Sequence, residues 1–140
     1  KPVMDIKVIK GIGIDIVDIA RMEKAIRRDA RIVEKILSPD EISQFIDRST
    51  NGRIDILSKR FIESIAARFA AKEALAKSLS LSLFNIGLHN IEILKEENSD
   101  VPLVKLCEEV KKKFILQSVL FYLSISHSDA SAVATVLATS

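Results

Sequence analysis

The stretch Arg60–Leu79, RFIESIAARFAAKEALAKSL, decides the fold of this chain. It contains neither Gly nor Pro and is rich in Ala, so it favours a long helix. At about 100° per residue, its larger apolar side chains fall on one stripe, which we expect to face a core. The members of this stripe are Phe61, Ile65, Phe69, Ala76 and Leu79.

Charged residues interrupt this apolar stripe. Arg68 and Lys72 fall in its middle, and Glu73 lies at its edge. A buried cation is costly without an anion beside it, and such departures from local rules often mark a functional site. The alternative is structural: Arg68 and Lys72 extend to solvent from the rim of the stripe, and Glu73 pairs with Lys77 on the surface. Periodicity alone does not choose between the two.

Length and composition indicate one compact domain spanning residues 1–140. The hydrophobic share of 48% excludes disorder, and 21 basic against 19 acidic residues is too even to indicate nucleic-acid binding. Cys107 is the single cysteine, so an internal disulfide is excluded and a reducing compartment is favoured. No apolar run approaches the roughly 20 residues that span a membrane. We therefore expect a cytoplasmic protein without a membrane partner.

The N-terminal third predicts a strand followed by helices. Residues 6–16 are rich in β-branched side chains, and Gly11 and Gly13 suit a strand whose backbone is closely approached by another element. Asp15 is expected to end this strand. Asp18 then caps a helix that runs to Arg28, and a second helix begins after Ser38. In that helix, Pro39 occupies the first position and Glu41 completes a capping box.

The remainder of the chain predicts short strands and helices. Residues 48–53 read as a loop, and residues 78–87 as either a fraying helix end or a short strand. The other expected elements are strands at 88–94 and 101–105, a helix at 106–117, and a hairpin of strands 119–126 and 131–138 with His127 in its bend. The predicted fold class is α+β, with helices packed on one face of an antiparallel sheet.

Three residues far apart in the sequence are candidates for one site: Asp15, Glu73 and His127. Two carboxylates, completed by waters and a phosphate oxygen, are a common way to hold Mg²⁺. The cations Arg68, Lys72 and Lys77 around such an ion would neutralise phosphate charge. Each candidate also has a plain structural interpretation: Asp15 can cap the following helix, and a lone turn histidine is usually a surface residue.

Arg21, Lys24 and Arg28 form one basic face on the first predicted helix, since they are spaced three and four residues apart. Such a face is most often plain surface, but it can also bind an acidic helix of another protein. Lys111, Lys112 and Lys113 are interpreted as a solvated helix face.

Three segments resemble the signatures of the bacterial short-type 4′-phosphopantetheinyl transferases, the holo-acyl-carrier-protein synthase family. They are Gly11-Ile12-Gly13-Ile14-Asp15 followed by Arg21, Phe69-Ala-Ala-Lys72-Glu73-Ala74 with Lys77, and Ser124-Ile125-Ser126-His127-Ser128. The resemblance runs through nearly the whole chain in the family's order. One departure follows the long helix, where the family has a glycine-rich segment and this chain has only Gly87.

The resemblance implies transfer of 4′-phosphopantetheine from coenzyme A to a serine of apo-acyl carrier protein, in support of fatty acid biosynthesis. It implies that Asp15 and Glu73 bind Mg²⁺ and that Lys77 joins them in catalysis. The other implied roles are coenzyme A binding by Arg68, Phe69, Lys72, Lys77 and His127, and docking of the acidic carrier by Arg21, Lys24 and Arg28. It also implies a homotrimer with sites shared between subunits. Either Glu73 or a metal-bound water would take the serine proton.

Two other classes of function remain as alternatives. A non-catalytic module that binds RNA or an acidic protein through its basic helices is disfavoured, because the chain has one Tyr and no Trp for base stacking. A structural trimer-forming scaffold is the other alternative, in which the polar residues only satisfy an interface. Calorimetry with coenzyme A and Mg²⁺ separates the scaffold from the enzyme.

Overall fold

The computed structural model describes residues 7–46, 52–96 and 98–140, and its central element is helix α4 (Lys59–Ser78). The Ala-rich stretch therefore forms the predicted helix, shifted by one residue at each end. Ser58 begins it as the N-cap, because its side chain accepts a hydrogen bond from the Phe61 backbone N–H at 3.2 Å. The helix ends after Ser78, and Ser80 follows with a positive φ of 55°.

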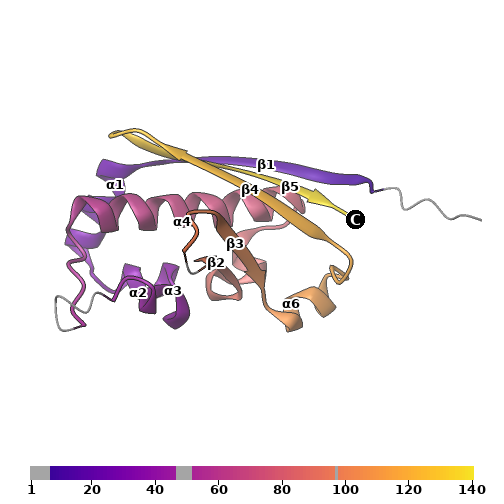
Figure 1. Cartoon of the computed structure of the whole chain (residues 1–140), viewed down its shortest axis with the longest axis horizontal. Helices are drawn as coiled ribbons and strands as arrows, with labels where there is room; N and C mark the ends of the chain where they lie inside the picture. Colours follow the sequence, from indigo (N-terminus) through magenta and orange to yellow (C-terminus); the bar gives the residue numbers. More distant parts are fainter. Residues whose placement is uncertain (1–6, 47–51, 97) are drawn as a thin grey trace, which may run out of the picture.

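A three-stranded antiparallel sheet covers one side of α4. Its strands are β1 (Ile9–Asp18), β4 (Leu120–His127) and β5 (Ser131–Thr139), in the order β1-β5-β4. Figure 1 shows α4 lying along one face of this sheet, while no described helix covers the opposite face. Strand β1 runs beyond the predicted end at Asp15, which is paired with Ala134 inside the sheet.

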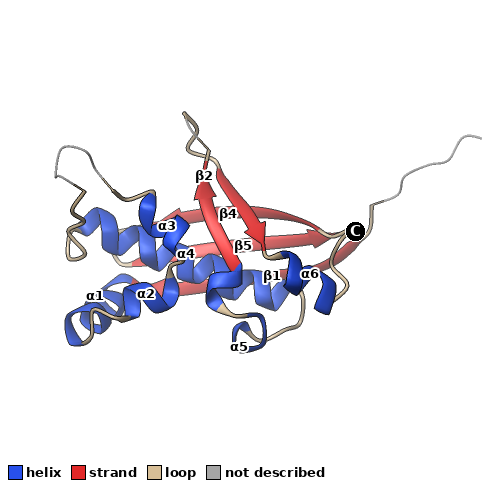
Figure 2. Ribbon diagram, turned by 90° about the horizontal axis from the view of Figure 1, so that it is seen from below, coloured by secondary structure: helices blue, strands red, loops and turns tan. Residues whose placement is uncertain are grey.

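The other side of α4 is covered by a second layer. A two-stranded antiparallel sheet, β2 (Ile91–Lys95) and β3 (Pro102–Leu106), lies between two groups of short helices (Figure 2). The short helices are α1 (Ile19–Arg28), α2 (Ile32–Ile36), α3 (Pro39–Ser43), α5 (Leu83–Ile86), α6 (Glu108–Lys113) and the 3₁₀ turn η2 (Leu88–Asn90). Helix α4 is therefore buried from two sides, which explains why most of its alanines are buried together with Phe61 and Ile65 of the apolar stripe.

Two hydrophobic clusters form the core along α4. One lies under α1, α2 and α3, where Met22, Ile26 and Ile36 pack on the first half of α4. The other joins the second half of α4 to both sheets and to α6. The buried members on α4 itself include Ile62, Ile65, Ala66, Ala70, Ala71, Ala74 and Leu75.

The predicted α+β class with antiparallel strands is confirmed, but the strands form two sheets rather than one. Residues 88–90 form a 3₁₀ turn before β2, and residues 78–87 contain the end of α4 followed by α5. The helix predicted at 106–117 is shortened to α6, because Leu106 pairs with Ile91 in β3 and Ile115 adopts a positive φ of 56°. His127 is the last residue of β4, paired with Ala132, rather than in the bend.

The predicted loop at 48–53 lies mostly outside the described residues. Within the described part of the chain, each helix is too short or too polar to span a lipid bilayer.

Candidate active site

Close packing between β1 and α4 builds the first part of the site. A Cβ placed on Gly13 would lie 1.9 Å from the carbonyl oxygen of Ala74, and one on Gly11 would lie 2.0 Å from that of Ser78. The two glycines therefore let the β1 backbone rest directly on the helix, as their positions in the sequence predict. Because alternate residues of a strand share a face, Asp15 follows Gly13 toward α4.

Asp15 reaches Lys77 of α4 across this contact. The Lys77 ammonium lies 3.1 Å from Asp15 Oδ1 and donates a second hydrogen bond, at 3.0 Å, to the carbonyl oxygen of Ile14. The Asp15 side chain is 19% exposed and that of Lys77 is 54% exposed, so the pair lies at the surface. Its cation is therefore accessible to an anionic ligand.

Glu73 lies beside this pair, one turn before Lys77 on α4. Burial raises the pKa of the Glu73 carboxyl, the negative charge of Asp15 raises it further, and Lys77 partly opposes the shift. The structure thus brings the two predicted carboxylates close enough to repel each other. Such a pair gains from a cation between its oxygens.

The donor set fits Mg²⁺ better than a transition metal. Within the described residues, no three His, Cys, Asp or Glu side chains gather into a metal-binding cluster. Asp15 and Glu73 supply only hard carboxylate oxygens, and Mg²⁺ is usually bound through one or two carboxylates while it keeps several waters. These two residues would hold the ion.

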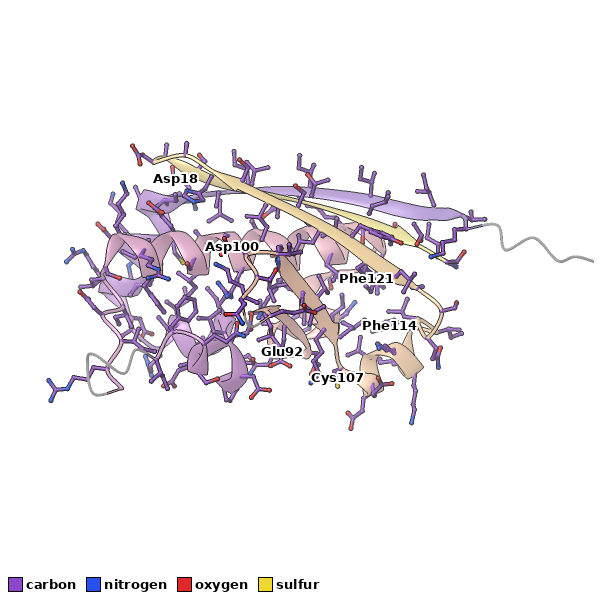
Figure 3. All side chains as sticks on the ribbon, in the orientation of Figure 1. Asp18, Glu92, Asp100, Cys107, Phe114 and Phe121 are labelled. Carbon is purple, nitrogen blue, oxygen red and sulfur yellow. The ribbon has the colours of Figure 1, made fainter. Side chains whose placement is uncertain are left out.

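A pocket on the other side of α4 contains two further predicted residues, Arg68 and His127. It has a volume of about 590 Å³ and lies between α4, the β2–β3 hairpin and the end of β4. Glu63, also in its wall, has a carboxylate oxygen 3.7 Å from His127 Nδ1. Its lining includes Arg60, Ser64, Lys95, Asp100 (labelled in Figure 3), Pro102 and Ser124.

The pocket and the carboxylate pair do not meet within one chain. Ser64 lines the pocket and Glu73 carries the carboxylate; being nine residues apart at about 100° per residue, they lie on opposite sides of α4. The strands agree with this, since β1 and β4 are the two edges of the sheet. Phe69 packs against both hydrophobic clusters and is not among the pocket-lining residues.

Lys72 lies inside the protein, away from Asp15 and Glu73. Its side chain is 0% exposed, and its ammonium donates to the Ile36 carbonyl at 2.6 Å, to Glu41 Oε1 at 2.6 Å and to the Leu88 carbonyl at 2.9 Å. An ammonium has three N–H donors, so none is left for a phosphate. The charge of Lys72, which falls in the apolar stripe, is thus neutralised by Glu41 inside the protein.

Sequence reasoning placed Glu41 in a capping box but missed that its carboxylate also neutralises Lys72. The predicted capping box is present, with the Glu41 carboxylate accepting from the Ser38 N–H at 3.0 Å. The same carboxylate is 0% exposed and also binds Lys72. The sequence carried a signal for it, namely two cations without anions on a core-facing stripe.

The predicted basic face lies on α1. Arg21, Lys24 and Arg28 are all exposed, while Met22 and Ile26 on the opposite side are buried. Asp18 begins this helix by accepting the Arg21 backbone N–H at 3.2 Å. Because α1 follows β1 directly, the basic face begins six residues after Asp15.

Comparisons with a family model, with known sequences and with solved structures agree with one another. Residues 11–136 match the model of the 4′-phosphopantetheinyl transferase superfamily. The holo-(acyl-carrier-protein) synthase of Clostridium botulinum strain Eklund 17B is 36% identical over 126 residues, covering 90% of this chain and 94% of that relative. Two solved structures are similar throughout. The Helicobacter pylori holo-(acyl-carrier-protein) synthase in complex with coenzyme A is 35% identical, with a TM-score of 0.70 and coverage of 91% and 98% of the two chains. The Bacillus anthracis enzyme, in complex with CoA (3′,5′-ADP), is 31% identical, with a TM-score of 0.70 and coverage of 94% and 97%.

Proposed function

Since the chain belongs to the 4′-phosphopantetheinyl transferase superfamily, we propose that it transfers 4′-phosphopantetheine from coenzyme A to a serine of apo-acyl carrier protein. The products are holo-acyl carrier protein, which serves fatty acid biosynthesis, and adenosine 3′,5′-bisphosphate. The observation that carries this proposal is the meeting of Asp15, Glu73 and Lys77 where β1 rests on α4.

The reaction breaks the phosphoanhydride bond of coenzyme A and forms a phosphoester bond to the carrier serine. The serine oxygen bonds to the phosphorus that carries the pantetheine arm, and the bond from that phosphorus to the bridging oxygen breaks. The electron pair leaves with the bridging oxygen. A protein nucleophile is not required, so orientation and charge neutralisation are the main tasks of the site.

We assign each residue of the cluster a role. Asp15 and Glu73 hold Mg²⁺, which supplies positive charge to the pyrophosphate when bound. Lys77, half exposed beside Asp15, binds phosphate oxygens. Glu73 is also proposed to accept the serine proton.

The pocket on the other side of α4 is proposed to bind the nucleotide part of coenzyme A. Arg68 and His127 lie in its wall, with Arg60 and Lys95, so cations are available for phosphate. Its volume of about 590 Å³ falls in the range of small-molecule sites.

A trimer would unite the pocket of one subunit with the carboxylates of the next. The uncovered face of the three-stranded sheet supports such an assembly, because Ile12, Ile14 and Ile16 on it are 67%, 60% and 65% exposed. Figure 3 shows side chains standing out from this face with no described element above them. We propose a homotrimer in which neighbouring subunits complete each site.

The acidic carrier is proposed to dock on Arg21, Lys24 and Arg28. The basic face on α1 begins shortly after Asp15, so a carrier bound there would bring its serine toward the carboxylates. Charge attraction of this kind mainly accelerates association.

Mass spectrometry tests the proposed function. The chain is incubated with coenzyme A, Mg²⁺ and several apo-acyl carrier proteins, and each carrier is expected to gain the mass of one phosphopantetheine. A carrier whose acceptor serine is replaced by alanine is the matched control and should gain nothing. No mass gain on any carrier would overturn the proposal.

A further inference from the structure

A buried charge cluster lies between the nucleotide pocket and the short helices. At its centre the Glu41 carboxylate accepts hydrogen bonds from three groups: Ser38 N–H at 3.0 Å, Lys72 Nζ at 2.6 Å and Ile93 N–H at 3.1 Å. Arg68 Nε lies 3.9 Å from the second carboxylate oxygen. A fully buried carboxylate with this many partners fixes the positions of all of them.

Ile93 connects Glu41 to Arg68 through its own peptide groups. Its N–H donates to Glu41 Oε2 at 3.1 Å, and its carbonyl accepts from Arg68 Nε at 3.0 Å. Gln44, one turn after Glu41, binds both the N–H and the carbonyl of Lys95 at 3.0 Å. Side chains of α3 and α4 thus occupy the edge of β2 that a further strand would otherwise pair with.

The same contacts shape the pocket. Ile93, Leu94 and Lys95 of β2 form part of its wall, and Arg68 is in the wall as well. The Arg68 guanidinium carbon lies 4.7 Å from the centre of the Phe45 ring, which fixes the plane of the group from another side.

The two Nη groups of Arg68 remain available. In the described part of the chain, Nε is the Arg68 nitrogen that hydrogen-bonds to the protein, and Thr139 Oγ1 is the one buried side-chain N or O atom without a partner. The Nη groups are therefore not sealed in the core, although the residue is only 7% exposed. Since Arg68 lines the pocket, this opening faces it.

We propose that Glu41 is a positioning residue for coenzyme A binding: it holds Arg68 and the β2 wall so that the Arg68 Nη groups meet phosphate, and Lys72 is its internal counter-ion. This inference rests on the proposed function. Glu41 itself touches neither substrate, and Lys72 binds no phosphate because its donors are used.

Three variants separate positioning from plain stability: Glu41→Gln, Lys72→Met and the two combined. In Glu41→Gln, the amide keeps one acceptor oxygen for two N–H groups, those of Ser38 and Ile93, and leaves the Lys72 charge unpaired. The double variant removes the unpaired Lys72 charge, while Arg68 still lacks the Glu41 carboxylate, so its melting temperature should recover part of the way toward that of the parent chain. In the double variant, Ile93 of β2 and Arg68 still lack the Glu41 carboxylate that they contact in the parent chain.

The measurement is the KM for coenzyme A and the KM for the carrier, with the Kd for coenzyme A from calorimetry. The double variant is expected to show about a tenfold rise in the KM and Kd for coenzyme A, the cost of weakening one charge-assisted contact. Its KM for the carrier should be unchanged. Glu34→Gln, on the exposed surface of α2, is the matched control and should leave all three values as they are.

Two results would overturn the inference. If the double variant binds coenzyme A as tightly as the parent, Glu41 serves stability alone, while the proposed function stands. If its KM for the carrier rises as much as its KM for coenzyme A, the loss is general and the positioning role is wrong. A parent chain that transfers nothing overturns the proposed function and this inference together.

Discussion

Gly13 of β1 and Ala74 of α4 are in backbone contact, since a Cβ on Gly13 would lie 1.9 Å from the Ala74 carbonyl oxygen. No side chain fits there. This contact sets the height of β1 above the helix, and with it the distance between Asp15 and Glu73. The candidate metal site therefore depends on a glycine that carries no chemistry.

Replacing this glycine should damage both stability and activity. Gly13→Ala forces β1 away from α4, and we expect a loss of about 2 kcal/mol in the free energy of unfolding, as for other overpacked positions. Transfer activity per folded molecule should fall as Asp15 moves from Glu73. Urea denaturation and the transfer assay measure the two effects.

Gly87→Ala is the matched control for that prediction. Gly87 has a φ of 93°, and an added Cβ would meet the Asn90 side chain at 2.8 Å, so the control should also lose stability. Gly87 lies far from β1 in the sequence and does not belong to the cluster of Asp15, Glu73 and Lys77. The transfer activity per folded molecule should therefore persist. Equal loss of activity in both variants would contradict the role assigned to Gly13.

Glu73→Gln should stabilise the metal-free protein while strongly reducing transfer. The folded protein binds the Glu73 proton more tightly than the unfolded chain, because the folded pKa is raised above the ordinary 4.5. The contribution of this group to stability is fully present below pH 4.5 and is lost as pH rises through the folded pKa. At neutral pH the charged carboxylate is therefore unfavourable, and the amide removes that cost.

Melting temperature against pH measures this effect. The difference between Glu73→Gln and the parent should be greatest near neutral pH and should shrink on acidification. Transfer should fall by roughly 100-fold or more, as expected when a metal ligand is lost. A variant that is less stable at neutral pH, or that keeps full activity, would count against the arrangement of Asp15 and Glu73.

Salt should weaken docking of the carrier. Changing Arg21, Lys24 and Arg28 together to alanine should raise the KM for the carrier about tenfold at low ionic strength and flatten its dependence on salt. Transfer assays at several NaCl concentrations measure the KM for the carrier and its dependence on salt. Alanine at Lys111, Lys112 and Lys113 of α6 removes the same charge elsewhere; if that control has the same effect, docking follows net charge and not α1.

The uncovered sheet face should mediate assembly. Ile14→Glu places a charge in that face and is expected to reduce the sedimentation coefficient and to lower activity, because each site would lose its neighbour's part. Phe84→Glu is the control, since Phe84 is 95% exposed on α5, away from the sheet. Unchanged sedimentation of the Ile14 variant would show that this face is not the interface.

Local sequence signals predicted most of the elements. The Ala-rich helix, the Asp18 and Ser38 caps and the C-terminal hairpin all depend on residues close together in the chain. Gly11 and Gly13 correctly predicted a close backbone approach, although the sequence did not say that α4 would be the partner.

Long-range pairings could not be predicted in this way. Glu41 and Lys72 are 31 residues apart, and periodicity shows only that Lys72 faces inward, not which anion meets it. The same holds for the two sheets, because β2 pairs with β3 while its other edge is bound by side chains of α3 and α4. Periodicity places Lys72 in the apolar stripe and not Lys77, but only the folded arrangement shows that Asp15 is the partner of Lys77.

The most direct test of the central claim is a Mn²⁺ titration followed by electron paramagnetic resonance in the presence of coenzyme A, with Mn²⁺ standing in for Mg²⁺. The parent chain should bind one Mn²⁺ per subunit, and Asp15→Asn and Glu73→Gln should each weaken binding by about tenfold or more, while Glu34→Gln binds as the parent does. Parent-like binding by either variant of the carboxylate pair would contradict the claim that Asp15 and Glu73 hold one divalent cation between them.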